Sequence, residues 1–257
     1  MIRTGIDTLS AKRSDGLSVS NGLVETVCLV LVGIASARTV NLSHLSGEMP
    51  TQAKIESTYR RLQRFFQHVG VGEDWTARLV IWMLGLCGNW HLCLDRTHWK
   101  IACKQIKLLV LAVATRHYRV PLIWTVLGKA GNSSTKERIA LMKRYLDLFG
   151  AESIKCLLAD REFIGFDWLD FLHNQDIPFI IRVRSNQYVI CEDGTRRSLR
   201  ALLRTCRGKR AFSAHFGTSK DAAPVCLNFA AKRIKGKELL IGVSNRPAHH
   251  ALTTYRT

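Results

Sequence analysis

The sequence predicts an α/β fold: a mixed sheet with a helical N-terminal region and a β-rich insert. Three observations support this class. Residues 1–88 place apolar residues at helical spacing, residues 89–186 alternate strand-like runs with helical segments, and residues 187–245 hold short strand-like runs between basic turns. At 257 residues and 47% hydrophobic residues, the chain can bury a substantial core as one large domain or two.

The N-terminal region is predicted to contain three helices, Leu23–Ala37, Thr58–Val69 and Trp75–Leu86. A polar connection, residues 41–57, joins the first two. The aromatic residues of the second helix recur at helical spacing, which favours a core-facing stripe. The arginines of that helix lie elsewhere around it, and they either face solvent or contact phosphates: Arg60, Arg61 and Arg64.

Neither a secretory signal nor a membrane span is expected. The N-terminal segment is polar, and the apolar stretch Leu23–Ala37 includes Glu25 and is short for a span, so it is interpreted as a core helix. The 8 cysteines are scattered without CxxC spacing, which argues against a zinc site. Reduced cysteines inside apolar runs fit a reducing cytoplasm.

The central region begins with an apolar run, Leu92–Leu94, and a predicted antiparallel hairpin of strands Lys107–Thr115 and Pro121–Leu127. Ser134 and Glu137 then form a capping box. The helix that follows is expected to end at Gly150, a typical residue after a helix C-terminus. Its predicted bounds are Thr135–Phe149.

A second apolar run, residues 154–159, is a predicted strand, followed by a helix, Phe166–Asn174, and a strand, Phe179–Val183. The order strand, strand, strand, helix, strand, helix, strand matches the ribonuclease H-like fold. In that fold the first and fourth strands lie side by side. Beyond them, the insert is predicted to hold strands Tyr188–Cys191, Val225–Phe229 and Leu239–Val243, with a short helix at Ser198–Thr205.

Each of the two apolar runs leads directly into an aspartate, Asp95 and Asp160. Burying a carboxylate loses its hydration, so such a residue needs a basic partner or a metal ion. A single aspartate followed by arginine at a strand end is more often a capped turn. Here two such aspartates end strands that are expected to be neighbours, and the chain is strongly basic. This favours a pair of carboxylates side by side on the sheet.

The charge balance indicates a polyanionic partner. The net charge is +18, and residues 91–257 hold 29 of the 38 basic residues against 13 acidic ones. Within them, residues 182–237 hold 14 basic and 3 acidic residues. Such an excess favours nucleic acid most simply, or an anionic membrane surface.

Four blocks together resemble a known family: LDRTHWK around Asp95, LLADREFIG around Asp160, the strand end IIRVRSN, and the closing LLIGVSNRPAHHALTTYRT. They resemble bacterial insertion-sequence transposases of the DDE type, in the group marked by a Tyr-Arg-Glu-Lys signature. The resemblance implies a helical DNA-binding region (1–88), a ribonuclease H-like core (89–186), a β-rich basic insert (187–245) and the start of a final core helix (246–257).

The resemblance also implies the chemistry. Such transposases hydrolyse a phosphodiester and use the freed 3′-hydroxyl to attack a second one, with two divalent ions, Mg²⁺ or Mn²⁺. Carried over, Asp95 and Asp160 are the catalytic metal ligands, Arg161 stands beside the scissile phosphate or orients Asp160, and Glu162 pairs locally. The implied partner is duplex DNA at terminal inverted repeats, with a homodimer on paired ends left open. The candidate DNA contacts are Arg96, Lys100, Arg161, Arg182, Arg184, Arg196, Arg197, Arg207, Lys209, Arg210 and Tyr255.

One feature departs from the family pattern. The family's third carboxylate is a glutamate seven residues after the signature tyrosine, which Tyr255 matches, whereas the sequence stops at Thr257. We therefore expect a catalytically incomplete chain, either a truncated copy or part of a frameshifted gene. An alternative is a DNA-binding regulator that blocks the full-length enzyme. A host ribonuclease H-like nuclease would need a complete acidic cluster, and the late acidic residues lie in no matching context: Glu192, Asp193, Asp221 and Glu238.

Overall fold

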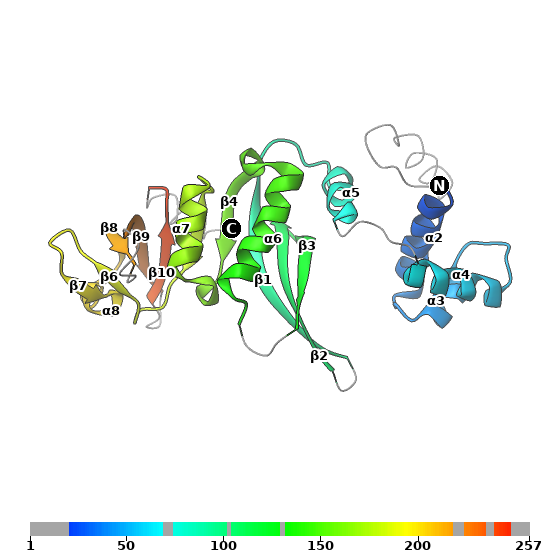
Figure 1. Cartoon of the computed structure of the whole chain (residues 1–257). Coiled ribbons are helices and arrows are strands. Elements are labelled where there is room, and N and C mark those ends of the chain that lie inside the picture. The colour runs from blue at the N-terminus through cyan, green and yellow to red at the C-terminus, as the bar shows by residue number, and fades with distance from the viewer. Residues whose placement is uncertain are drawn as a thin grey trace. The chain divides into compact units, whose positions relative to one another are not determined.

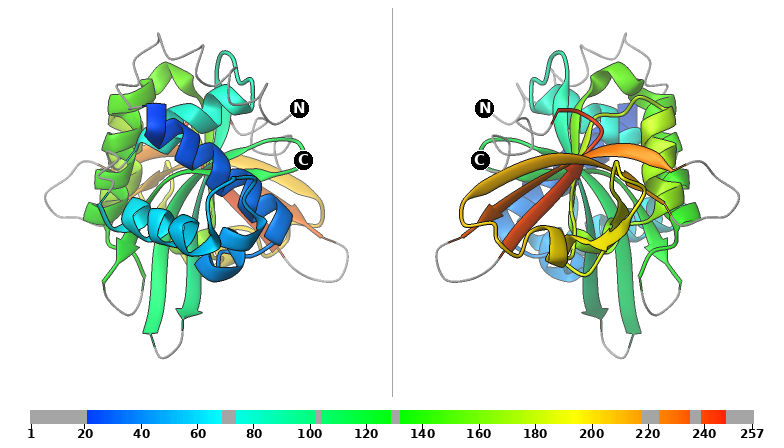
Figure 2. Two further views of the ribbon diagram at one scale, coloured as in Figure 1. Left: turned by 90° about the vertical axis from the view of Figure 1, so that its right-hand side faces the viewer. Right: turned by 90° about the vertical axis from the view of Figure 1, so that its left-hand side faces the viewer.

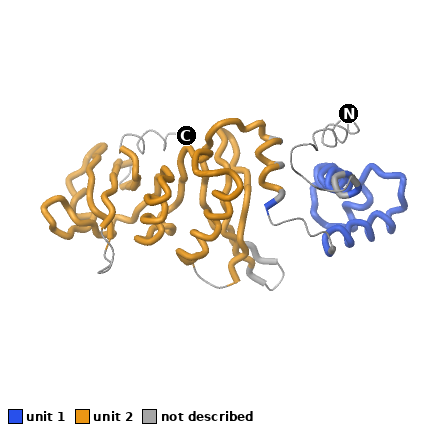
Figure 3. The backbone as a smooth tube through the Cα atoms, turned by 45° about the horizontal axis from the view of Figure 1, so that its top comes forward, with its two compact units in different colours: residues 1–75 blue, residues 76–257 orange. Residues whose placement is uncertain are grey.

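The computed structural model describes residues 21–68, 74–101, 104–128, 132–217, 224–234 and 239–247. The chain divides into two compact units, residues 1–75 and residues 76–257 (Figure 3). The first unit is helical in its described part, and the second contains a large sheet with its covering helices.

The helical unit contains α2 (Asn21–Ala37), α3 (Leu42–Glu48) and α4 (Ile55–His68). Helix α3 was not predicted: it lies in the segment expected only to be a polar connection between the first two helices. The Asn41 side chain caps this helix by accepting a hydrogen bond from the Ser43 N–H at 3.0 Å, and Leu45 is only 1% exposed. Tertiary burial of one leucine therefore stabilises a turn that the polar sequence does not reveal. The core of this unit comprises Leu29, Val30, Leu45, Met49 and Leu62.

Arg61 joins helices α2 and α4 inside the same unit. Its Nε and Nη2 donate to Thr26 Oγ1 at 3.1 and 2.8 Å, and Nη2 lies 3.4 Å from Glu25 Oε2. Arg60 and Arg64 are exposed. The alternatives of a solvated face or phosphate contacts therefore apply to those two arginines, while Arg61 has a structural partner.

Across the described residues, no helix by itself combines the length and apolar character needed to cross a membrane, although one bent pair, Glu25–Ala37 with Leu42–Glu48 at 97°, meets that test by length and composition.

The second unit begins with α5 (Trp75–Met83), which ends three residues earlier than predicted, and continues into a 10-stranded sheet (Figure 1). The strand order is β3-β2-β1-β4-β5-β10-β9-β8-β6-β7. The strands are β1 (Trp90–Ile101), β2 (Lys104–Ala114), β3 (Arg119–Leu127), β4 (Ile154–Ala159), β5 (Phe179–Arg182), β6 (Tyr188–Ile190), β7 (Arg196–Ser198), β8 (Lys209–Phe216), β9 (Val225–Arg233) and β10 (Leu239–Ser244).

The first five strands confirm the predicted ribonuclease H-like arrangement. Strands β1, β2 and β3 form an antiparallel meander, and β4 pairs parallel to β1 and to β5. The first and fourth strands are therefore neighbours, as the order of elements predicts. Strand β1 is much longer than the apolar run Leu92–Leu94, because β2 pairs with it as far as Ile101.

The β-rich residues that follow are continuous with this sheet. Strand β10 pairs antiparallel with β5, and β9, β8, β6 and β7 extend the sheet beyond it. Figure 2 shows the strong twist of the whole sheet, with β8 and β9 turned steeply away from the direction of β1 and β2. The functional boundaries at residues 88, 187 and 246 stay predictions, and residues 248–257 lie outside the described part.

Two strands, β7 (sequence RRS) and β8 (sequence KRAFSAHF), were not predicted, since their polar composition hides them. They form because β6 and β9 offer backbone partners. The predicted helix Ser198–Thr205 is shorter than expected, with α8 spanning Leu199–Leu202 and Ser198 as its cap.

Helices α6 (Thr135–Phe149) and α7 (Phe166–Asn174) lie on one face of the sheet (Figures 1 and 2). The capping box of α6 forms as predicted, and Gly150 ends the helix with a φ of 72°, a conformation that favours glycine. Two short 3-10 turns flank β4, η1 (Ala151–Ser153) and η2 (Arg161–Phe163). The fully buried Trp168 and Tyr145 lie in the core between these helices and the sheet.

Candidate active site

Three charged residues lie in one row across the sheet: Asp95 on β1, Asp160 directly after β4, and Arg182 at the end of β5. Each follows a buried residue that belongs to the core under α6 and α7, and those three buried residues are register partners. Since side chains alternate along a strand, the charged residues point to the opposite face. The residues that set this register are Leu94, Ala159 and Ile181.

The register brings the two predicted carboxylates together. Asp95 and Asp160 each come one residue after the last parallel pair of β1 and β4, and neighbouring strands lie about 4.8 Å apart. Both residues are exposed. The sequence analysis expects strand-end aspartates, whereas Asp95 lies within β1, paired with Val110 of β2. Asp95 directly follows Leu94, and Asp160 directly follows Ala159, its register partner. The two aspartates are therefore on the same face of the sheet.

Each carboxylate has a near neighbour that orients it. Asp95 Oδ1 accepts a hydrogen bond from the backbone N–H of Arg96 at 2.8 Å. Asp160 Oδ1 lies 3.3 Å from Nη1 of Arg182, with side chains that are 50% and 37% exposed. An ion pair with that exposure is weak, of order 1 kcal/mol or less. The Arg182 contact therefore neutralises Asp160 without locking it.

Glu162, in the turn after Asp160, pairs with Arg96 of β1. The distance from Arg96 Nη2 to Glu162 Oε2 is 2.9 Å, and Arg96 Nη1 donates to Asn132 Oδ1 at 2.9 Å. Arg96 therefore connects β1 to the turn that follows β4. Its predicted DNA contact stays a prediction.

Arg138 was not predicted as a site residue, because nothing in the sequence distinguishes it from a surface arginine of α6, yet it is only 6% exposed. Its Nη2 donates to the carbonyl oxygens of Ser133 at 2.7 Å and Glu162 at 3.3 Å, and its guanidinium lies 5.3 Å from the centre of the Phe163 ring. Burial lowers the pKa of Arg138, which the nearby Glu162 and Glu137 partly offset. Arg138 thus holds the turn directly after Asp160.

The predicted basic contacts of the β-rich segment lie on several elements rather than on one face of a strand. Arg196 stacks over Tyr188 with 4.9 Å between guanidinium and ring centre, and Arg197 pairs with Asp193 at 3.5 Å. Arg210 donates to the Leu202 carbonyl oxygen at 2.6 Å. Arg184, Arg207 and Lys209 are exposed. The remaining predicted residues lie outside the described residues or side chains: Lys100, Asp221, Glu238 and Tyr255.

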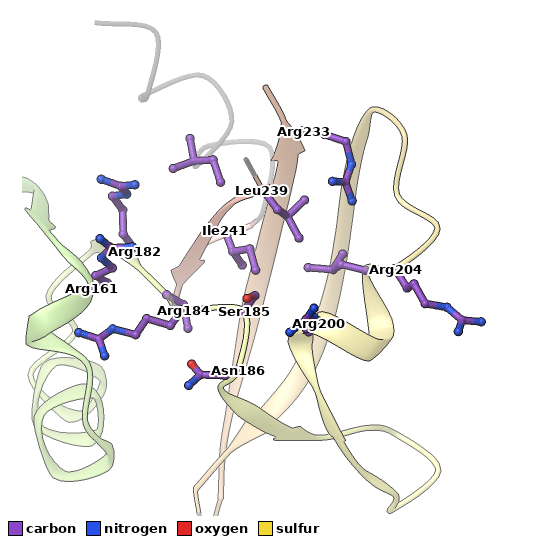
Figure 4. A pocket seen from close by; sticks show the side chains of 13 residues that line it. Arg161, Arg182, Arg184, Ser185, Asn186, Arg200, Arg204, Arg233, Leu239 and Ile241 are labelled. Carbon is purple, nitrogen blue, oxygen red and sulfur yellow. The ribbon is translucent and has the colours of Figure 1, made fainter. Parts of the chain in front are cut away.

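A cavity of about 590 Å³ opens beside the row, and we call it the arginine pocket (Figure 4). Six arginines line it from η2, from β5 and the turn after it, from α8 and the turn after it, and from β9, above an apolar floor that includes Leu239 and Ile241. Sequence reasoning named the arginines near the first two of these elements. It missed the others, because only the pairing of β10 with β5 and β9 brings them close. The six are Arg161, Arg182, Arg184, Arg200, Arg204 and Arg233.

The carboxylate pair suits a hard divalent cation, because Mg²⁺ and Mn²⁺ prefer carboxylate oxygens and keep several waters. Two exposed carboxylates at neighbouring register positions present such oxygens to one side of the sheet. Over residues 21–247, leaving out the gaps given above, no group of three or more His, Cys, Asp and Glu side chains is arranged to hold a metal ion. The pair thus fits part of a divalent-metal site.

Comparison with known proteins gives one family match. The family described as "Transposase DDE domain" matches residues 87–217, half of the chain. No curated protein sequence matches significantly.

The solved structures that are similar to this chain at low identity include two endonucleases V. Endonuclease V from Bacillus subtilis is 10% identical with a TM-score of 0.30, over 78% of this chain and 81% of that one. The catalytic domain of human endonuclease V is 13% identical with a TM-score of 0.31, over 79% of this chain and 86% of that one.

Proposed function

This chain belongs to the family of transposase DDE domains, and on that premise we propose that it is the transposase of a bacterial insertion sequence. Its substrate is then duplex DNA at the terminal inverted repeats, where phosphodiester bonds are hydrolysed and strands transferred. The register that makes Asp95 and Asp160 neighbours on one face of the sheet carries this proposal. The proposed location is the bacterial cytoplasm, where the DNA is, and a homodimer on paired ends belongs to the same proposal.

The proposed roles follow from the contacts of each side chain. Asp95 and Asp160 are the residues that would hold Mg²⁺ or Mn²⁺, which when bound activates a nucleophile and stabilises charge on the leaving oxygen. The Arg96 N–H donates to Asp95, and Arg182 pairs with Asp160. Arg161, exposed and next in sequence to Asp160, is proposed to contact the phosphate backbone together with Arg184.

Cleavage is proposed to need a further acidic ligand beside this pair. A site that stabilises both the attacking and the leaving oxygen uses two ions, and two carboxylates supply few of the ligands that two ions need. Losing part of that stabilisation costs several kcal/mol, and each 1.36 kcal/mol is tenfold in rate. We therefore expect these 257 residues to bind DNA and to show no detectable cleavage with Mg²⁺.

The test is a nicking assay on supercoiled DNA that carries the transposon ends. The 257-residue chain is compared with a version extended after Thr257 by a helix bearing the family's glutamate. The extended chain should nick at the ends, by roughly a thousandfold or more above the original, and Asp160→Ala in it should abolish nicking. A matched extension with glutamine in place of that glutamate is the control.

Two outcomes would contradict parts of this proposal. Robust Asp95-dependent nicking by the original chain would show that one of its own acidic residues completes the site, and Glu238 would be the first to replace. Absence of DNA binding by both versions would overturn the transposase assignment itself.

One observation favours a second candidate, a DNA-binding regulator of the full-length enzyme. The six pocket arginines contribute positive charge that does not depend on the metal site, so DNA contacts can persist without catalysis. A regulator would inhibit nicking by the extended chain when the original chain is added in excess. If the 257-residue chain occupies the same DNA ends and nicking by the extended chain is unchanged, the regulator hypothesis is contradicted.

A further inference from the structure

Arg182 belongs to both regions described above. It pairs with Asp160 at 3.3 Å, and it also lines the arginine pocket. We propose that the pocket binds a backbone phosphate of the DNA, and that this phosphate draws Arg182 away from Asp160, which frees the Asp160 carboxylate for a divalent cation. DNA binding would thereby assemble the metal site. This inference rests on the proposed function, and it adds a coupling between the two sites.

The pocket has the composition of a phosphate site. Arginine presents a planar fork of donors that matches phosphate oxygens, and several guanidinium groups around one cavity repel one another until an anion enters. Among the described residues, no carboxylate pairs with four of the six pocket arginines. In Figure 4, Arg161, Arg182 and Arg184 lie on one side of the cavity and Arg200 and Arg233 on the other, while the Arg204 side chain points away from them. The four are Arg161, Arg184, Arg200 and Arg204.

Arg233 shows how part of the pocket wall is held in place. Its Nε donates to the Cys206 carbonyl oxygen at 2.8 Å, and its backbone N–H donates to the Gly208 carbonyl oxygen. The turn after α8 is thereby attached to β9, on the side of the pocket that carries Arg204. That side is thus fixed to the sheet, so an anion that enters meets a preformed wall.

Arg182 is suited to exchange partners. Its contact with Asp160 is half-exposed, so the ion pair is weak and its loss is easily offset by a phosphate. While the contact persists, a positive guanidinium stands beside Asp160 Oδ1 and opposes a divalent cation there. Because phosphate and cation both favour the state in which Arg182 has left Asp160, each should favour the binding of the other.

The experiment measures Mn²⁺ binding by electron paramagnetic resonance of the free ion, with and without a saturating 20-base-pair duplex. The same duplex with the Asp160→Asn chain gives the background of Mn²⁺ held by DNA alone. In the unmodified chain, DNA should tighten Mn²⁺ binding by about fivefold or more, the usual size of coupling between sites. In Arg182→Gln, Mn²⁺ should bind tightly without DNA, and DNA should add nothing.

Arg204→Gln is the matched control, because it removes a pocket cation and leaves Arg182 in place. It should weaken DNA binding, yet DNA at saturation should still tighten Mn²⁺. If Arg182→Gln does not fold, Arg182→Lys replaces it. Lysine keeps the charge but loses the fork, so the tightening should fall below that of the unmodified chain.

The outcomes separate this inference from the function on which it rests. DNA that binds without changing Mn²⁺ affinity, or full tightening in an Arg182 variant, overturns the coupling and leaves the proposed function standing. A chain that does not bind the duplex at all overturns the proposed function.

Discussion

The two ends of the charged row differ in how their charges are compensated. At the β1–β4 end, Asp160 has Arg182, Glu162 has Arg96, and Asp95 accepts a backbone N–H. At the β5–β10 end, most pocket arginines have no carboxylate partner among the described residues. Among the described residues, the carboxylates of this row thus have partners within the protein, whereas four of the six pocket arginines have no carboxylate partner and are placed for a ligand. The whole chain has more basic than acidic residues, 38 against 20. The fold brings six of the arginines together in the pocket beside Asp160.

The two ends also differ in construction. The carboxylate pair needs only the register of two adjacent parallel strands, so its geometry follows from backbone pairing. The pocket needs side chains from a 3-10 turn, a strand, a short helix and a second sheet region. Because long arginine side chains line a backbone that is held by strand pairing, we expect their guanidinium groups to adjust to a ligand, whereas the positions of the two aspartates follow from the strand register. Three predictions test this comparison.

The largest effect is expected from replacing the four pocket arginines that have no carboxylate partner among the described residues. Replacing Arg161, Arg184, Arg200 and Arg204 with glutamine should lower duplex affinity by roughly a hundredfold or more at about 0.1 M salt. The slope of log affinity against log salt should flatten by about 0.9 for each phosphate that the protein no longer neutralises, because fewer counterions are released. Fluorescence anisotropy across a salt series measures both quantities.

The comparison set for this prediction is the exposed basic group Arg196, Arg197, Arg207, Lys209 and Arg210. Neutral residues there should also flatten the slope, but less for each residue replaced, since Arg197 and Arg210 already have partners within the protein. A larger effect from this set than from the pocket would move the main DNA surface to the outer strands. If the slope of log affinity against log salt is unchanged in both sets of variants, the main DNA-binding surface lies on the helical N-terminal unit.

An intermediate effect is expected at the acidic end, where Arg138 holds the turn after Asp160. Arg138→Met keeps much of the apolar stem but leaves the carbonyl oxygens of Ser133 and Glu162 without their donor, and should lower the free energy of unfolding by about 1–3 kcal/mol. Urea denaturation measures this change. Lys136→Met, at an exposed position of the same helix, should stay within about 0.5 kcal/mol. Equal effects of the two substitutions would show that the acidic end does not depend on this buried arginine.

The smallest effect concerns pH and strand β1. Burial lowers the pKa of His91 below its usual 6.5, and the positive charge of Lys155 lowers it further. The neutral form is therefore favoured in the fold, so its contribution to stability is present above pH 6.5 and is lost as the pH falls through the lowered pKa. Since the ring is only partly buried, we expect less than about 1 kcal/mol between pH 7 and pH 5.

His91→Gln should remove this contribution and flatten the pH dependence of urea unfolding over that interval. Parallel curves for the variant and the unmodified chain would show that β1 is not the pH-sensitive part of the acidic end. The pH dependence would then arise from other groups of the chain.

Sequence by itself determined the elements whose signals are local. The bounds of α6 follow from the Ser134–Glu137 capping box and Gly150, all within hydrogen-bonding reach of the helix ends. Strand β4 follows from a short apolar run, and helix α7 from apolar residues at helical spacing. The motif around each aspartate and the order of elements were enough to predict that Asp95 and Asp160 are neighbours.

Tertiary structure alone decided the features that depend on distant partners. Helix α3 exists because Leu45 is buried against other helices of its unit, and the polar strand β8 exists because β9 pairs with it. Arg138 is buried only because the turn after β4 packs against the start of α6. The arginine pocket arises because β10 pairs with both β5 and β9, which brings together arginines far apart in sequence. Local patterns report hydrogen bonding and periodicity within one element, whereas a pocket depends on long-range pairing that no single stretch of sequence contains.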